Sequence, residues 1–88
     1  MAKKYWDLND RVVSKAAITP SDTALNEFDA IFVGTGGDIA TVSVLDSAAV
    51  TLKNYGDGEW LPEAVIKVMA TNTTALNLVG VHLSKKPT

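Results

Sequence analysis

The run Leu76–Leu83, with the sequence LNLVGVHL, decides the fold class of this chain. Its residues favour strands, and apolar side chains stand on both of the faces that a strand presents, Leu76 and Leu78 on one and Val79 and Val81 on the other. A strand that is apolar on both faces has to be covered on both sides. In a chain of 88 residues, one cover is the domain's own core, and the second is either the opposite wall of a closed barrel or a neighbouring subunit.

Similar segments recur along the chain, and turn signals separate them at the short intervals typical of an antiparallel β domain. We predict strands over residues 11–17, 29–33, 38–45, 49–53, 63–70 and 76–83. Successive side chains of a strand point to opposite faces. In 38–45, this predicts an apolar face of Ala40, Val42 and Val44 and an opposite face with Thr41 and Ser43. In 63–70, it predicts an apolar face of Ala64, Ile66 and Val68. Helical spacing is weak, with a turn or two expected at most over residues 21–28. The sequence therefore predicts an all-β fold, either a small antiparallel β-barrel or a β-sandwich.

The start of the chain differs from the rest, because mixed charges surround the aromatic pair Tyr5 and Trp6. We interpret residues 1–16 as an extended N-terminal arm and residues 17–88 as the β domain. Tyr and Trp dominate the anchors of protein interfaces, so the pair is a candidate contact with a partner or a neighbouring subunit. The alternative is that Trp6 folds back onto its own domain.

Composition excludes several classes of function. The net charge of −2 provides no basic field for general nucleic-acid binding. The absence of cysteine and the single histidine exclude disulfides, cysteine-ligated zinc and thiol catalysis, and leave no His–His metal site within one chain. No secretory signal and no apolar run of about 20 residues is present, so we expect no membrane partner. We predict no catalytic, metal-binding or cofactor-binding residue and no cofactor, and we expect the protein not to be an enzyme.

The stretch GTGGD at residues 34–38 is the most conspicuous glycine-rich segment. Ile39 stands where a dinucleotide-binding fingerprint needs its third glycine, and no helical pattern follows, so phosphate binding is disfavoured. A hairpin in which Gly36 and Gly37 supply positive φ is the better interpretation. Over the whole chain, the residues predicted to form turns include Gly34, Gly36, Gly37, Gly56, Gly58 and Asn72.

Trp60 follows a glycine-rich acidic loop and has three interpretations: it stacks on a sugar ring, anchors a subunit contact or fills the end of the domain. A domain this small buries a limited share of its surface and has no disulfide, so we expect self-association to stabilise it. The candidate interface residues are Tyr5, Trp6, Trp60, Leu76, Leu78, Val79 and Val81.

Six blocks stand in a distinctive order along the chain: AITPSDT (17–23), AIFVGTGGD (30–38), VTLKN (50–54), WLP (60–62), VMATNTTA (68–75) and LVGV (78–81). In order and spacing, these blocks resemble the head spike base proteins of tailed bacteriophages and gene transfer agents, and the resemblance covers about residues 17–83. Two positions depart from the family pattern. Asn72 replaces a glycine, which Asn can do because it tolerates the left-handed region, and residues 63–65 replace a more basic strand.

The resemblance implies a structural virion protein, located in the capsid head and made in the host cytoplasm. Such proteins form a homo-oligomeric ring, here favoured to be a pentamer, at the capsid vertices. The ring connects the major capsid protein to a receptor-binding spike or fibre, with no nucleic-acid or membrane partner. Two alternatives stay open: a carbohydrate-binding module on the virion surface, which would use Trp60, and a capsid decoration protein that stiffens the shell elsewhere.

Overall fold

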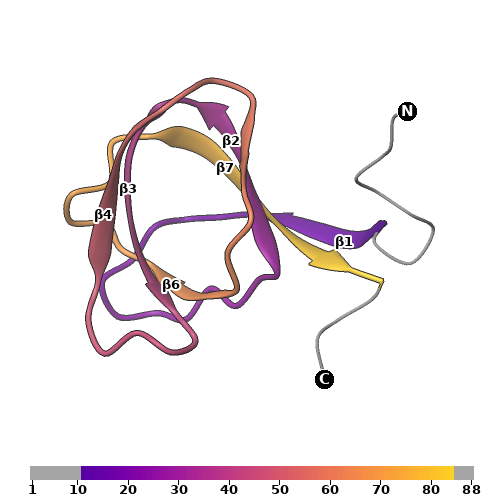
Figure 1. The fold of residues 1–88 in the computed structure, drawn as a ribbon, viewed down its shortest axis with the longest axis horizontal. Helices are drawn as coiled ribbons and strands as arrows, with labels where there is room; N and C mark the ends of the chain where they lie inside the picture. The colour runs from indigo at the N-terminus through magenta and orange to yellow at the C-terminus, as the bar shows by residue number, and fades with distance from the viewer. Residues whose placement is uncertain (1–10, 85–88) are drawn as a thin grey trace.

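A computed structural model of the chain describes residues 11–84, which form two antiparallel β-sheets (Figure 1). Among these residues there is no helix, and so none that is long and apolar enough to cross a membrane. The all-β prediction is confirmed, and of its two alternatives the arrangement is sandwich-like and not a closed barrel. The strands are β1 Val12–Ala17, β2 Ala30–Thr35, β3 Gly37–Ser43, β4 Val50–Tyr55, β5 Glu59–Leu61, β6 Val65–Val68 and β7 Leu76–Leu83.

The larger sheet has the strand order β1-β7-β2-β5, and the smaller sheet has the order β4-β3-β6. Strand β7 is the run that predicted the fold class, and it lies inside the large sheet, where Val79 stands opposite Ala17 of β1 on one side and Phe32 of β2 on the other. An interior strand is flanked by ladders on both edges, which is the setting that its β-branched and apolar residues favour.

The core lies between the two sheets and is made of side chains that alternate inward from each. From the large sheet, Ile31 and Val33 are 0% exposed, and Leu78 is 3% exposed. They meet the small sheet's inward side chains, and the core cluster as a whole consists of Ile18, Ile31, Val33, Ile39, Leu61, Val65, Val68, Ala75 and Leu78. One face of β7 therefore packs on the domain's own core.

The glycine-rich stretch does not form the hairpin that the sequence predicts. Strands β2 and β3 belong to different sheets, so the chain crosses from the large sheet to the small one at Gly36. A Cβ atom on Gly36 would collide with the backbone carbonyl oxygen of Tyr55, so space and not positive φ requires a glycine there. Of the predicted pair, Gly37 has a positive φ of 157°. The left-handed region is occupied by Gly58 (φ 73°), Asn54 (φ 64°), Asn72 (φ 70°) and Asn77 (φ 57°). Of the other predicted turn glycines, Gly34 lies in β2 and Gly37 begins β3, whereas Gly56 lies in the turn between β4 and β5, as predicted.

The predicted face of 63–70 is wrong, because Val65 and Val68 point into the core while Ala64 is exposed. The register of β3 and β6 shifts between Val42 and Ser43, and such a bulge lets two residues three positions apart face the same side. The face predicted for 38–45 is wrong too: Thr41 is 1% exposed, and Val44, which lies beyond the end of β3, is 59% exposed.

Residues 21–28 form no helical turn and instead run along the outer edge of β6. The Ser21 N–H donates to the Val68 carbonyl at 2.8 Å, and the Asn26 N–H donates to the Ile66 carbonyl at 2.9 Å. Phe28 then forms a bridge with Val65. This segment forms hydrogen bonds with the outer edge of β6, whose backbone groups would otherwise be unpaired.

Strand β1 lies at the edge of the large sheet, and all six of its residues are exposed. With the C-terminal part of β7 it forms a two-stranded ribbon that projects from the rest of the sandwich (Figure 1). Residues 12–16 of the predicted arm therefore form part of this ribbon. Tyr5 and Trp6 lie outside the described residues.

Candidate functional site

The outer face of the large sheet, which points away from the core, carries an apolar groove of about 470 Å³. Strand alternation explains its composition: because Ile31 and Val33 face the core, Phe32 faces outward, and it stands opposite Trp60 of β5 and Val79 of β7. The complete lining is Val12, Lys15, Phe32, Trp60, Val79 and Val81. We call this surface the outer groove.

The aromatic pair at one side of the outer groove is ordered by a ring contact. The rings of Phe32 and Trp60 lie 5.2 Å apart at 66°, the edge-to-face geometry that aromatic pairs favour. Trp60 is 40% exposed, and Lys15 is the only polar side chain of the lining. An apolar surface with one cation fits a protein partner better than a sugar, whose hydroxyl groups would each need a polar partner.

Exposed apolar side chains extend beyond the outer groove. Among residues 11–84, the large hydrophobic side chains with substantial exposure are Val12, Val13, Leu25, Val44, Leu45, Val50, Trp60 and Leu76. Single exposed apolar residues are ordinary on a soluble protein, but a contiguous patch marks an interaction site. Two of these side chains, Val12 and Trp60, line the outer groove together with the apolar Phe32, Val79 and Val81, and the outer groove is therefore the candidate functional site.

The structure brings together three of the predicted interface residues, because Trp60, Val79 and Val81 all line the outer groove. Leu78 is part of the core instead. Leu76 is 61% exposed at the start of β7 and does not line the groove.

Sequence reasoning missed Val12, Lys15 and Phe32 as members of the outer groove. A signal for Phe32 was present, because Ile31, Phe32 and Val33 make the strand apolar on both faces, as in β7. Val12 and Lys15 lie three positions apart and reach the same groove because a bulge interrupts β1 after Val12.

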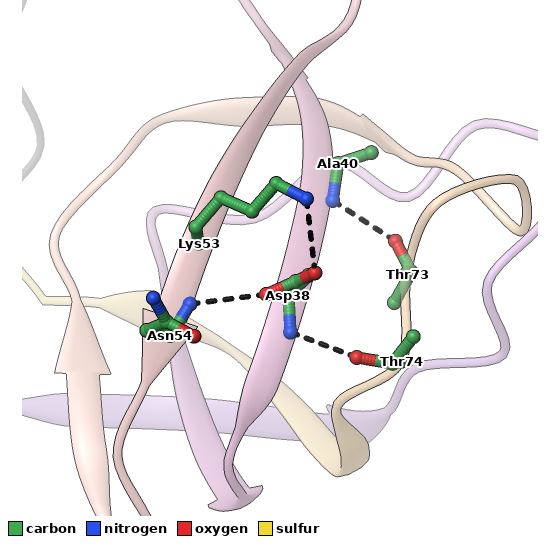
Figure 2. Close-up of polar contacts among 6 residues, drawn as sticks. All are labelled: Asp38, Ala40, Lys53, Asn54, Thr73 and Thr74. Carbon is green, nitrogen blue, oxygen red and sulfur yellow. Dashed lines mark hydrogen bonds and ion pairs between the residues drawn. The ribbon is translucent and has the colours of Figure 1, made fainter.

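A polar cluster ties the loop before β7 to the small sheet, and Figure 2 shows Asp38 at its centre. The Asp38 N–H donates to the Thr74 hydroxyl at 2.9 Å, and one Asp38 carboxylate oxygen accepts the Asn54 N–H at 3.0 Å. The other carboxylate oxygen lies 3.4 Å from the Lys53 ammonium, and the Ala40 N–H donates to Thr73. Several of the blocks that resemble head spike base proteins meet here, so these residues support the fold.

Asp22 anchors the same loop from its other end. One carboxylate oxygen accepts the N–H groups of Ala70 at 3.0 Å and Thr71 at 2.9 Å, and the other accepts the Thr71 hydroxyl at 2.7 Å. The bond from the Thr71 backbone and then the one from its hydroxyl lower the pKa of Asp22 below its ordinary value of 3.8. Asp22 therefore stabilises the fold in its ionised form.

We predict that Asp22→Asn lowers the melting temperature at neutral pH, because the amide replaces one of the two charged acceptor oxygens by a donor. A carboxyl group whose pKa is depressed in the folded state stabilises above its unfolded value, near 3.8, and loses this effect as the pH falls through the folded value. The difference in melting temperature between the wild type and Asp22→Asn should therefore become smaller below pH 3.8. Thr23→Ala is the matched control, and an equal gap at every pH would contradict the prediction.

Glu63 is a half-buried acid that accepts the hydrogen bond of the buried Thr41 hydroxyl group. The Thr41 hydroxyl lies 3.1 Å from both carboxylate oxygens, and the Ser43 hydroxyl donates to one of them. Burial raises the pKa of Glu63 above 4.5, the bond from Thr41 lowers it, and the charge of Asp46 raises it again. The net direction is upward, so ionised Glu63 destabilises the folded state relative to its protonated form.

We predict that Glu63→Gln raises the melting temperature at neutral pH, because the amide resembles the protonated acid and can still accept a hydroxyl hydrogen bond. An acid with a raised pKa in the folded state favours folding as the pH falls through that value toward 4.5. The advantage of the variant should therefore disappear below pH 4.5 in calorimetric scans. A variant that is less stable than the wild type at pH 7 would contradict the prediction, because it would show that the hydrogen bonds of the carboxylate stabilise the fold by more than its burial costs.

A second, open cavity of about 300 Å³ lies between the start of β2 and β6. Its titratable groups are Glu27, Asp29 and His82, and Asp29 accepts the Leu83 N–H at 2.8 Å while it lies 3.8 Å from His82. No three His, Asp or Glu side chains within residues 11–84 are placed to hold a metal ion together. The outer groove thus remains the candidate site.

Comparison with known proteins identifies a similar capsid chain among the solved structures. No family model and no curated protein matches the chain. A chain from a solved structure described as the capsid of a native gene transfer agent (GTA) particle, computed with C5 symmetry, is similar with a TM-score of 0.74 and 34% sequence identity. The match covers 92% of this chain and 95% of the other, so it extends over the whole domain.

Proposed function

This chain belongs to the family of phage and gene transfer agent structural proteins represented by that capsid chain, and from this premise we propose that it is a structural protein of a virion head. The single observation that carries the proposal is the 34% identity over 92% of the chain. More specifically, we propose that it is a head spike base, a non-enzymatic adaptor that connects the capsid to a receptor-binding spike or fibre.

The proposed assembly is a pentameric ring at a capsid vertex. The symmetry of the matched particle supports five copies, because a reconstruction with C5 symmetry repeats each of its chains five-fold about one axis. The outer groove supports self-association, since it is an apolar surface that one copy leaves partly exposed.

The proposed partners are the major capsid protein on one side of the ring and the spike or fibre protein on the other. In this arrangement the N-terminal arm with Tyr5 and Trp6 reaches the capsid or a neighbouring copy. The turn of residues 56–60 holds the fibre, and it is a well-defined platform because the Asp57 carboxylate accepts the Gly36 N–H and the Glu59 carboxylate accepts the Gly56 N–H at 3.1 Å.

Imaging of particles tests this function. The gene is deleted in a strain that produces the particles, and vertex density is compared with that of the wild type by cryo-electron microscopy. We expect loss of the vertex structure and its fibre while the shell stays intact, with restoration by the wild-type gene. Loss of density elsewhere on the shell would identify a decoration protein and contradict the vertex role. A glycan array that shows binding abolished by Trp60→Ala would favour the carbohydrate-binding module.

A further inference from the structure

Residues 44–49, which connect β3 to β4 and which we call the β3–β4 turn, present apolar side chains where turns usually carry polar ones. All of these residues are exposed, and Leu45 is 94% exposed with Val44 beside it at 59%. Gly, Pro, Asn, Asp and Ser dominate turns because of their backbone preferences, so the turn itself does not call for a valine and a leucine. Adjacent exposed apolar side chains at a loop tip indicate a partner.

The β3–β4 turn is held in one shape without a partner. The Ser43 carbonyl accepts the Asp46 N–H at 3.0 Å, and one Asp46 carboxylate oxygen accepts the Ser43 N–H at 2.9 Å. Leu45 lies between these two residues and is therefore displayed on a preorganised support. Preorganisation lowers the entropy cost of binding, so such a side chain suits an interface anchor.

The outer groove is a surface of this chain that matches the β3–β4 turn. Its lining is apolar apart from Lys15, and its volume of about 470 Å³ accommodates a leucine side chain. The turn joins two strands of the small sheet, whereas the groove lies on the face of the large sheet that points away from the small one. In Figure 1 the turn lies at the lower left and the β1–β7 ribbon at the right. The two surfaces therefore do not meet within one copy.

We propose that the β3–β4 turn of one copy inserts Leu45 into the outer groove of the next copy in the ring. The inference rests on the proposed function, because it specifies the contact that builds the proposed ring. A contact between two different surfaces is heterologous, so each copy gives one turn and receives another. Such contacts close into a ring when the rotation between copies allows it.

Charge complementarity favours this occupant of the outer groove. Residues 43–49 contain one charged side chain, Asp46, and the groove lining contains one, Lys15. Within residues 11–84, neither of them takes part in an ion pair. Insertion of Leu45 brings the adjacent Asp46 to the groove, where its carboxylate can meet the Lys15 ammonium. An opposite pair at the rim of an apolar contact fixes the register of the two partners.

Asp46 has a local reason to favour a cation from a neighbouring copy. Burial raises the pKa of Glu63, and the charge of Asp46 raises it further, because the two carboxylates repel one another. A lysine that approaches Asp46 reduces this repulsion. The N-terminal arm is the other segment that could fill the groove, but residues 1–10 contain two lysines and two aspartates and so bring no net charge to Lys15.

Substitution of Leu45 tests the contact by light scattering on the full-length chain. Leu45→Ser should weaken association at least about thirtyfold, the effect of removing an interface anchor, with an unchanged circular dichroism spectrum because the side chain is exposed. Leu25→Ser is the matched control, since Leu25 is 61% exposed and lies outside both the turn and the groove. Equal association of the two variants would overturn the proposal. Loss of association on deletion of residues 1–10, with Leu45→Ser unaffected, would identify the arm as the occupant instead.

Asp46→Asn and Lys15→Gln test the charged pair. Asparagine keeps an oxygen that can accept the Ser43 N–H, so the turn retains its shape. Each variant should weaken association about threefold, and the double variant should be no weaker than either single one, because both changes remove the same interaction. Losses that multiply in the double variant would show that the two side chains do not meet, and would overturn this seating of the turn.

Cross-linking locates the contact, and the absence of natural cysteines makes it specific. Ala48→Cys labels the turn, and Ala17→Cys labels the face of the groove, because Ala17 stands opposite Val79; both positions are exposed. A short bismaleimide should link neither single variant to itself, a reassembled mixture of the two into dimers, and the double variant into a ladder that ends at the ring size. A ring without this ladder, or a chain that stays monomeric at tens of micromolar, would overturn the proposal, whereas the vertex function is decided separately by the particle images.

Discussion

Replacement of Gly80 by valine is expected to lower the free energy of unfolding by about 3 kcal/mol, near the upper end of the usual cost of overpacking a core. Gly80 lies in the middle of β7, opposite Ala16 on one side and Ile31 on the other. A Cβ atom there would collide with the ring of Phe28. A domain of this size is stabilised by about 5–10 kcal/mol, so the variant loses a large fraction of its stability.

Phe28 cannot yield easily, because its position joins the two sheets. Its backbone N–H donates to the Val65 carbonyl at 3.2 Å, and its carbonyl accepts the Val65 N–H at 3.1 Å. Its ring lies 5.1 Å from the ring of His82. The backbone bonds to Val65 and the contact with His82 therefore hold the Phe28 ring against Gly80. A side chain added at Gly80 has to displace this ring and with it a contact between the two sheets.

Urea unfolding of four proteins, the wild type, Gly80→Val, Phe28→Ala and the double variant, measures this effect. If the Phe28 ring is the cause, Gly80→Val should cost at least about 1 kcal/mol less in the Phe28→Ala background, because residues in contact are not additive. Equal costs in the two backgrounds would show that the ring is not what Gly80 accommodates.

Replacement of Val79 by aspartate is expected to abolish self-association while the domain stays folded. Val79 lines the outer groove on the face of β7 that points away from the core. A neighbour that covers the groove would bury the new carboxylate in an apolar lining whose one cation is Lys15. An incompletely compensated buried charge costs about 3 kcal/mol or more per contact, equivalent to about 100-fold weaker association. Sedimentation velocity measures the association, and circular dichroism checks the fold.

Leu76→Asp is the matched control, because it makes the same chemical change on the same strand. Leu76 is 61% exposed and lies outside the outer groove, so this variant should associate like the wild type. If both variants associate normally, the groove is not covered by a neighbouring copy. If both fail to associate, added negative charge and not the groove is responsible.

The sequence predicted β7 residue for residue, because Asn77, Gly80 and His82 are the only interruptions of a run whose two faces are both apolar. It missed β5, which has three residues and precedes Pro62, too short a segment for any period to be visible. It assigned Gly36 to a hairpin because a glycine needed for close approach leaves the same signal as one needed for positive φ.

The sequence predicted some residues of the outer groove and missed others, and the regularity of the strand that holds each residue explains the difference. Val79 and Val81 were found because they lie on a strand with a regular period. Val12 and Lys15 were not found, because a bulge breaks the period of β1, and Phe32 was assigned to a strand whose second face was not considered. Bulges depend on the partner strand, so the single sequence contains no local signal for them.

Static light scattering of the purified 88-residue chain tests the central claim most directly, namely that one copy exposes more apolar sheet surface than it can cover and that copies therefore join. The account predicts, at tens of micromolar and moderate salt, a closed species of about five times the chain mass of 9.3 kDa. A single species of 9.3 kDa over the whole concentration range would contradict it.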